Sequence, residues 1–348
     1  MADVDSYLLY DTAAPQALAG KFERHKHLLP AFAQAAATQA IFPTLTESEF
    51  LDRAQGCLLG LAVGEAIGSA VEYLSRDSFD AVTGMIGGGP LDLAPGEWTD
   101  GTAMALCLAK SLLDSETVEQ YDFMTRLKAW LTEGDNTVAG SSLAVGATTR
   151  AAIESFIEDD EPSAGSQDGA SAGNGSLIRL APLAIFTAKS GGVAPILSSK
   201  QSRATHATIE CLDACELLTV QLVDALGGAD LASALRPRIM QLAPNTLAIN
   251  AGEWKHKSRD EIRSSAYVID TLDAALWAVW TTDNFRDAVL TAVNLGGDAA
   301  SVGAVAGQLA GALYGCEAIP AEWQSTVAWS AELKDLAVKL AEAGADAF

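Results

Sequence analysis

Two stretches of the sequence carry a glycine at every fourth residue, and this spacing constrains the fold more than any other feature. One stretch holds Gly56, Gly60, Gly64 and Gly68, and the other holds Gly303, Gly307, Gly311 and Gly315. In an α-helix, such residues form a stripe along one face. Each glycine weakens a helix by roughly 1 kcal/mol relative to alanine. We therefore expect both helices to be central and closely packed, with packing on each other as one arrangement that repays this cost.

Helical periodicity recurs along the rest of the chain. Apolar residues repeat with the spacing of amphipathic helices, whereas alternating runs of β-branched residues are nearly absent. The sequence therefore predicts an all-α protein, a compact orthogonal multi-helix bundle that forms one domain over residues 46–348. The chain of 348 residues is long enough to bury a sizeable core.

Residues 1–45 are predicted to form a separate N-terminal extension, because three prolines divide an alanine-rich segment into short helices or turns. Two interpretations of this extension remain open. Its apolar residues can pack on the bundle as an extra arm. Alternatively, Tyr7, Tyr10 and Phe22 are the kind of aromatic anchors that a protein interface uses.

Composition excludes several classes of partner. The formal net charge of −23 argues against a nucleic-acid backbone or an anionic membrane surface. The chain opens without a basic start and an apolar run, so no signal peptide is predicted. Its cysteines number five and sit mostly among apolar residues, which indicates reduced thiols. We expect a cytoplasmic protein.

Two predicted helices begin with hydroxyl and carboxylate side chains. Thr99 and Asp100 open one apolar helix, and Asp298 and Ser301 flank the start of the second glycine helix. Such residues commonly cap helix N-termini, which is the simpler interpretation of each motif alone. If the two starts face each other, they offer oxygen ligands to a hard cation.

These motifs carry a family resemblance. The runs Gly-Glu-Trp-Thr-Asp-Gly-Thr at 96–102 and Asn-Leu-Gly-Gly-Asp-Ala-Ala-Ser at 294–301 resemble the two metal motifs of the ADP-ribosylglycohydrolase family, roughly T-D-D-T and G-G-D-x-D-T. The chain departs from both patterns. Gly101 and Ala300 stand where each motif has its second Asp, and Ala144 stands where arginine-directed relatives have an active-site Asp. The resemblance implies the family's helical fold.

The first glycine helix ends in a run similar to the family's G-D-A-x-G-x-x-x-E. In this run Glu65 replaces the Asp, and we expect the longer side chain to lose a supporting contact. Glu72 matches the catalytic carboxylate near the metal in some members. A solvated Glu at a helix end is the simpler alternative.

Three further segments match positions that bind the substrate in the family. Gly173, Asn174, Gly175 and Ser176 resemble a turn that faces the ADP-ribose, and glycine there permits close approach of the backbone. His206 follows Thr205 as in the family's T-H, and Tyr267 matches an aromatic position. Alternatively, these residues are a plain helix-terminal turn, a core histidine and a core aromatic.

The resemblance implies a hydrolase that uses Mg²⁺ or Mn²⁺. Because two carboxylates are missing from the paired motifs, we expect at most one weakly bound ion, or none. The interpretation that the sequence favours is a catalytically impaired relative that binds ADP-ribose, an ADP-ribosylated protein or an ADP-ribosyltransferase. Residues 1–45 would contact that enzyme in an immunity role. The alternatives are an active ADP-ribosyl hydrolase and a purely structural use of the fold.

Overall fold

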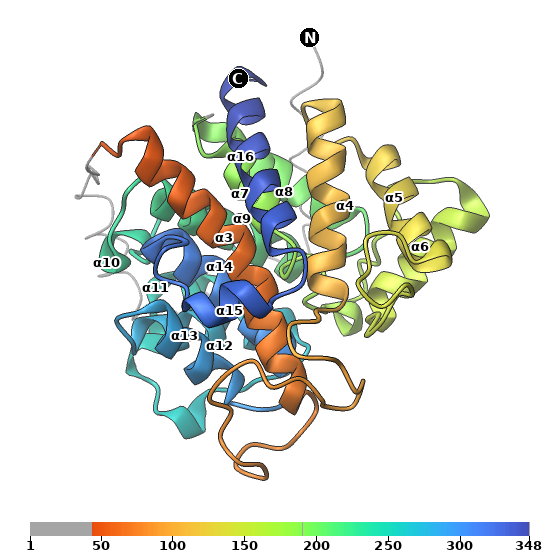
Figure 1. Ribbon diagram of the computed structural model, residues 1–348. Helices are drawn as coiled ribbons and strands as arrows, with labels where there is room; N and C mark the ends of the chain where they lie inside the picture. The colour runs from red at the N-terminus through yellow and green to blue at the C-terminus, as the bar shows by residue number, and fades with distance from the viewer. Residues whose placement is uncertain (1–43, 190, 348) are drawn as a thin grey trace, which may run out of the picture.

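The structure, a computed structural model, describes residues 44–189 and 191–347. These residues form 14 α-helices, labelled α3 to α16 in Figure 1, with short 3-10 helices and no β-strand other than isolated bridges. The predicted all-α fold is therefore confirmed. Nearly all of the N-terminal extension predicted over residues 1–45 lies outside the described residues.

Helices of different lengths run in several directions through the molecule. In Figure 1, α3 crosses the molecule obliquely, α4 stands upright, and the long connection between them loops below. The first seven α-helices are α3 (Glu47–Gly68), α4 (Asp100–Ser115), α5 (Gln120–Glu133), α6 (Ala147–Asp159), α7 (Ala181–Thr187), α8 (Ala194–Arg203) and α9 (Ile209–Leu226). The other seven are α10 (Leu231–Ala234), α11 (Pro244–Ala251), α12 (Val268–Trp280), α13 (Phe285–Val293), α14 (Ala299–Tyr314), α15 (Ala321–Thr326) and α16 (Ser330–Ala347). The 3-10 helices are Ser69–Val71, Gly169–Ser171, Gly191–Val193, Glu253–His256 and Arg259–Glu261.

The two glycine stripes pack directly against each other along α3 and α14. A Cβ placed on Gly64 would lie 1.9 Å from the carbonyl oxygen of Gly303, and one on Gly60 would lie 2.3 Å from that of Gly307. Gly56 meets the backbone of Gly311 in the same way. The expected close packing is confirmed, and the two stripes together are called the glycine seam below. At its ends, Gly68 meets Ala299 and Gly315 meets Asp52.

Helix α3 is the apolar axis of the bundle. It begins with a capping box in which Thr46 and Glu49 bond each other's backbone amides. The helix together with its 3-10 extension is long and apolar enough by composition to cross a membrane, but 89% of its most apolar window is buried inside the fold. It therefore behaves as the core helix of a folded domain.

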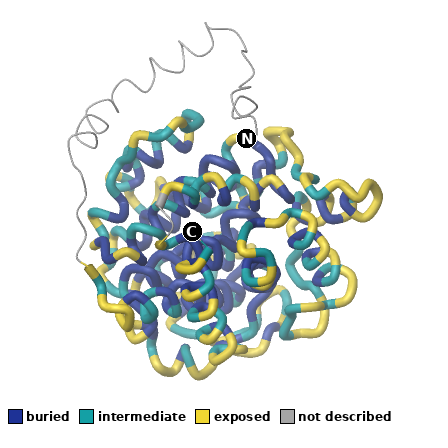
Figure 2. The backbone as a smooth tube through the Cα atoms, turned by 90° about the horizontal axis from the view of Figure 1, so that it is seen from above, coloured by how far each residue is buried: buried dark blue, intermediate teal, exposed yellow. Residues whose placement is uncertain are grey.

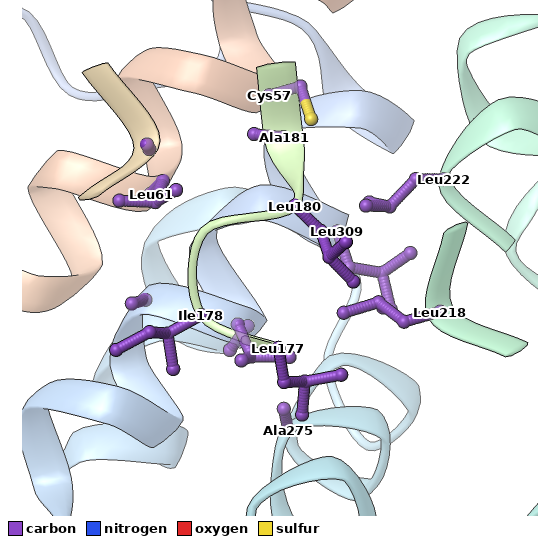
Figure 3. Packing of buried hydrophobic residues seen from close by; sticks show 14 of the residues in the cluster. Cys57, Leu61, Leu177, Ile178, Leu180, Ala181, Leu218, Leu222, Ala275 and Leu309 are labelled. Atoms are coloured by element: carbon purple, nitrogen blue, oxygen red, sulfur yellow. The ribbon is translucent and has the colours of Figure 1, made fainter. Parts of the chain in front are cut away.

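The core surrounds this pair of helices. In Figure 2 the buried backbone gathers in the middle of the molecule and the exposed backbone forms its rim. Figure 3 shows the segment before α7 threaded through this core, with Leu177 and Leu180 near Leu218 of α9 and Leu309 of α14. All four side chains are buried. The turn at residues 173–176 is thus anchored directly to the core.

Candidate active site

Two cavities adjoin where α3 ends and where α4, α12 and α14 begin. The larger has a volume of about 340 Å³ and the smaller about 90 Å³. Among the predicted site residues, the larger is lined by Asp100, Gly173, Asn174, Gly175, His206 and Tyr267. The smaller is lined by Glu72, Thr99, Asp100, Asn174, Asp298 and Ser301. Asp100 and Asn174 line both cavities, so the two form one continuous candidate site.

Glu65 of α3 caps the N-terminus of α4. Thr99 is the N-cap residue, but its side chain accepts no capping hydrogen bond. Instead, its hydroxyl donates to Glu65 Oε1 over 2.9 Å, and the amide of Gly101 donates to the same oxygen over 2.7 Å. The amide and hydroxyl of Thr102 donate to Oε2 over 2.9 and 2.5 Å. The expectation that Glu65 loses a contact is therefore wrong, because its carboxylate accepts four hydrogen bonds.

Glu72 caps α14 in the same manner. Its Oε2 accepts the amide of Ala300 over 2.7 Å, while the N-cap residue, Asp298, makes no capping bond of its own. Glu65 near the end of α3 and Glu72 just after the following 3-10 helix thus accept amides at the two N-termini. The simple capping interpretation fails for Thr99 and Asp298, and both are left to line the smaller cavity. Glu72 is buried, so the solvated alternative for it is also wrong.

Three carboxylates face the smaller cavity. Burial, together with the nearby carboxylates of Asp298 and Asp100, raises the pKa of Glu72 to about 10. Burial likewise raises the pKa of Asp100 well above its usual range, with neighbouring carboxylates adding to the effect. Like charges held this close disfavour ionisation unless a cation joins them.

The side-chain oxygens of this cavity suit a hard cation. Carboxylates and hydroxyls are the ligands that Mg²⁺ and Mn²⁺ prefer. Three formal negative charges match one dication and fall short of two. As the side chains lie, no group of three or more His, Cys, Asp or Glu among the described residues is close enough together to hold a metal ion. The chemistry of the residues fits one dication and does not fit a pair.

Asn174 connects the two cavities. Its amide nitrogen donates to Asp298 Oδ2 over 2.7 Å and to Thr271 Oγ1 over 2.8 Å. The side chain predicted to face a substrate therefore also positions a carboxylate of the smaller cavity. Thr271 lies in α12 and was not predicted as part of the site.

Of the two glycines in the 173–176 turn, Gly175 is required by close neighbours. A Cβ on Gly175 would lie 2.7 Å from Thr149 Oγ1 and 2.8 Å from His206 Cε1. A Cβ on Gly173 would lie 3.4 Å from His206 Nε2. Glycine keeps the wall of the larger cavity formed by backbone and leaves the imidazole beside it.

The remaining predicted residues divide between the cavity and the core. Tyr267 lines the larger cavity, and its hydroxyl donates to Glu210 Oε2 over 2.6 Å. Ser176 lines neither cavity. It is buried and accepts a hydrogen bond from Ser202 of α8 over 2.8 Å, with Cys215 of α9 at 3.4 Å. The prediction that Ser176 contacts the substrate is therefore wrong, and the residue instead packs in the core.

Three of the positions that depart from the family motifs lie at this site or next to it. Ala144 and Ala300 line the smaller cavity, and Ala144 has a φ of 55°. Gly101 has no positive φ, and a Cβ there would lie 2.9 Å from Glu65 Oε1. The longer Glu65 therefore fills the space next to Gly101.

Tyr73, which none of the predicted motifs includes, belongs to the cavity wall. Tyr73 lines the smaller cavity, is 67% exposed and has a φ of 63°. The structural signal is an exposed aromatic residue next to Glu72 whose backbone is in the left-handed region, because strained backbone is common at functional sites.

Comparisons with known proteins identify the class of this fold and site. The family model for ADP-ribosylglycohydrolase matches residues 46–347. This chain belongs to the ADP-ribosylglycohydrolase family, as its motifs predict. It is 45% identical to the ADP-ribosylarginine hydrolase Tri1 of Pseudomonas putida (strain GB-1), over 95% of each protein.

Two further relatives agree. The chain is 34% identical to the ADP-ribosyl-[dinitrogen reductase] glycohydrolase of Rhodospirillum rubrum, over 79% of this chain and 90% of that protein. A solved structure described as an ADP-ribosylglycohydrolase-related protein complex matches with a TM-score of 0.77 and 39% identity. That match covers 85% of this chain and 99% of the solved one.

Proposed function

We propose that this protein is a hydrolase that releases ADP-ribose from modified arginine side chains of a protein. The observation that carries the proposal is the convergence of Glu72, Asp100 and Asp298 on a small cavity that opens into a larger, glycine-lined one. The sequence alone favours an impaired binder. Similarity to the Tri1 hydrolase over nearly the whole chain shifts the weight to an active enzyme.

The larger cavity is the proposed site for ADP-ribose. Its volume of about 340 Å³ lies in the range of small-molecule sites. The backbone of Gly173 and Gly175, His206 and Tyr267 line it and supply polar contacts. Because Asp100 and Asn174 line both cavities, we place the glycosidic bond at the junction.

Glu72 is the proposed acid–base residue. Its Oε2 accepts the amide of Ala300, and the carboxyl is also held by a side-chain hydrogen bond with Asp298. Burial fixes the side chain, and Asn174 fixes the neighbouring Asp298. A buried carboxyl with a raised pKa holds its proton near neutral pH, as a general acid must.

One Mg²⁺ or Mn²⁺ ion is part of this proposal. The proposed ligands are Thr99, Asp100, Asp298 and Ser301, with Glu72 beside them. When bound, the ion would orient the ribose and stabilise developing negative charge.

The proposed substrate is an ADP-ribosylated protein in the cytoplasm. All five cysteines are buried and unpaired, which suits a reducing compartment. The net charge of −23 disfavours nucleic acid as a partner.

A second function is favoured by one observation. Gly101 and Ala300 provide no carboxylate at positions where the family motifs have one, so binding without turnover is the competing proposal. In that case the partner is a modified protein or an ADP-ribosyltransferase, with residues 1–45 as the contact segment.

Release of ADP-ribose from ADP-ribosylarginine and ADP-ribosylserine peptides, measured with Mg²⁺ and with chelator, tests the proposal. We expect metal-dependent release from the arginine peptide, and a loss of at least about 100-fold in Asp298→Asn, which keeps the side-chain shape. Tight binding of ADP-ribose without release from either peptide would favour the second function.

A further inference from the structure

Arg179 is a fully buried cation whose hydrogen bonds all go to neutral groups. Its Nε donates to Gln201 Oε1 over 2.8 Å, and its Nη2 donates to the Gln201 carbonyl over 3.0 Å. Nη2 also donates to Thr205 Oγ1 over 2.9 Å. Within the described residues no carboxylate forms an ion pair with it, and Phe123 lies under the guanidinium at 4.9 Å. Burying such a charge without an ionic partner costs free energy, which suggests that Arg179 has a role in the site.

The guanidinium determines how the Thr205 hydroxyl is used. Arginine has only donors, so Thr205 Oγ1 accepts from Arg179. The same oxygen lies 2.7 Å from His206 Nδ1. Thr205 is fully buried, and its own proton is satisfied when it donates to Nδ1. Nδ1 is then an acceptor, and the proton of the neutral imidazole resides on Nε2.

The opposite face of the imidazole borders the larger cavity. His206 lines that cavity, and its Nε2 would lie 3.4 Å from a Cβ on Gly173 and 3.2 Å from one on Gly175. No hydrogen bond to Nε2 forms within the part of the chain that the structure describes. The backbone of His206 is held by Ser202, which bonds both its amide and its carbonyl.

We propose that Arg179 acts through Thr205 as a positioning residue that fixes His206 as a neutral imidazole with its N–H at Nε2, aimed into the larger cavity. That N–H donates one hydrogen bond to an oxygen of the bound ligand. The ligand contact rests on the proposed function, whereas the tautomer rests on the protein's own hydrogen bonds.

The electrostatics of this part of the site agree with a neutral ring. Burial, together with the nearby charge of Arg179, lowers the pKa of His206 to about 3. An imidazolium would carry a proton on Nδ1 as well, and the Thr205 proton already points at that nitrogen. His206 is thereby excluded as a general acid near neutral pH and is retained as a hydrogen-bond donor.

Histidine-selective ¹⁵N labelling of the full chain tests the relay directly. Two-bond correlations of the imidazole protons identify the tautomer, and His206→Gln assigns the signals among the four histidines. We expect Nε2–H in the unmodified protein and in Thr205→Ser, which keeps the hydroxyl. Thr205→Val keeps the shape and removes the hydroxyl, so the ¹⁵N signal of Nδ1 should move to the position of an unprotonated nitrogen that accepts no hydrogen bond.

Affinity for ADP-ribose provides the second measurement. Thr205→Val should weaken binding by about fivefold, the usual effect of losing one hydrogen bond, and Thr205→Ser should restore most of it. An Nδ1–H signal in the unmodified protein, or an Nδ1 signal that does not move in Thr205→Val, would overturn the relay. Absence of ADP-ribose binding by the unmodified protein would overturn the ligand contact and the proposed function, while the tautomer signals still decide the relay.

Discussion

Helix α3 is joined to its two site-bearing neighbours in opposite ways. Against α14 it presents glycines, and the backbones meet with no side chain between them. Against α4 it presents one long side chain, Glu65, whose carboxylate accepts four hydrogen bonds from the helix start. The first junction positions Asp298, and the second positions Thr99 and Asp100.

The difference shows which changes each junction tolerates. At the glycine seam any added atom must separate two backbones in a close-packed core. At the α4 junction the carboxylate and the space beside it form a matched pair, so a change in one is compensated by a change in the other. We expect the seam to tolerate no larger side chain. We expect the α4 junction to tolerate a substitution when its partner changes as well.

The largest effect is expected from breaking the seam with Gly64→Ala. Its Cβ would lie 1.9 Å from the Gly303 carbonyl oxygen, so the helices must move apart. The free energy of unfolding should fall by at least about 3 kcal/mol, the upper end of overpacking costs. Urea unfolding measures it.

Gly192→Ala is the matched control. A Cβ there meets no atom within 4 Å, and its φ is not positive. We expect a change within about 1 kcal/mol. Alanine favours a helix more than glycine does, so helix propensity predicts no loss in either variant. Equal losses in the two variants would therefore contradict the claim that contact across the seam sets the cost.

The glycine seam was accessible from the sequence because its signal is local and periodic. Four glycines at i, i+4 spacing in each of two segments indicate both the helices and the faces that meet. The all-α class followed from the same periodicity. Which residues meet at the ends of the seam, such as Gly315 and Asp52, depends on the offset of the two helices and carries no sequence pattern.

A smaller effect is expected at the α4 junction. Gly101→Asp should lower the unfolding free energy by about 2 kcal/mol, because its Cβ would lie 2.9 Å from Glu65 Oε1 and it adds a second carboxylate there. Glu65→Asp removes one methylene from the opposing side chain. The double variant should therefore be about 1 kcal/mol more stable than the sum of the single changes predicts.

A double-mutant cycle by urea unfolding measures this coupling. Additive effects would mean that Glu65 and Gly101 are independent departures from the family pattern. Backbone strain does not enter, since Gly101 has no positive φ.

The site was only partly predictable because its contacts are remote in sequence. The resemblance to family motifs predicted that Glu72, Asp100, Asn174 and Asp298 belong to one site. The cap on α4 comes from Glu65, 34 to 37 residues away from its partners, and no local rule assigns it. Ser176 shows the opposite failure, because a motif residue next to the cavity turns into the core instead.

A third effect, of similar size and dependent on pH, concerns a buried carboxylate that lacks the four bonds of Glu65. Asp213 of α9 accepts the amide of Ala243, and burial raises its pKa to about 7. A raised pKa means that the folded state holds a proton that the unfolded state loses, so stability falls as pH rises from about 4 to about 7. Asp213→Asn removes this loss and keeps an oxygen for Ala243.

Urea unfolding at pH 4.5 and pH 8 measures the free energy of unfolding of both proteins. Relative to the unmodified protein, Asp213→Asn should be about 2 kcal/mol more stable at pH 8 than at pH 4.5. Glu154→Gln, an exposed change, should show no such pH trend. If the difference in unfolding free energy between Asp213→Asn and the unmodified protein does not change with pH, Asp213 does not have a raised pKa.

The number of Mn²⁺ ions bound per chain, measured alongside ADP-ribose release from an ADP-ribosylarginine peptide, tests the central claim most directly. Three carboxylates in a cavity of about 90 Å³ should hold one ion, and release should rise with its occupancy and vanish in Asp298→Asn. Two ions bound per chain, or release that persists in chelator, would contradict the account.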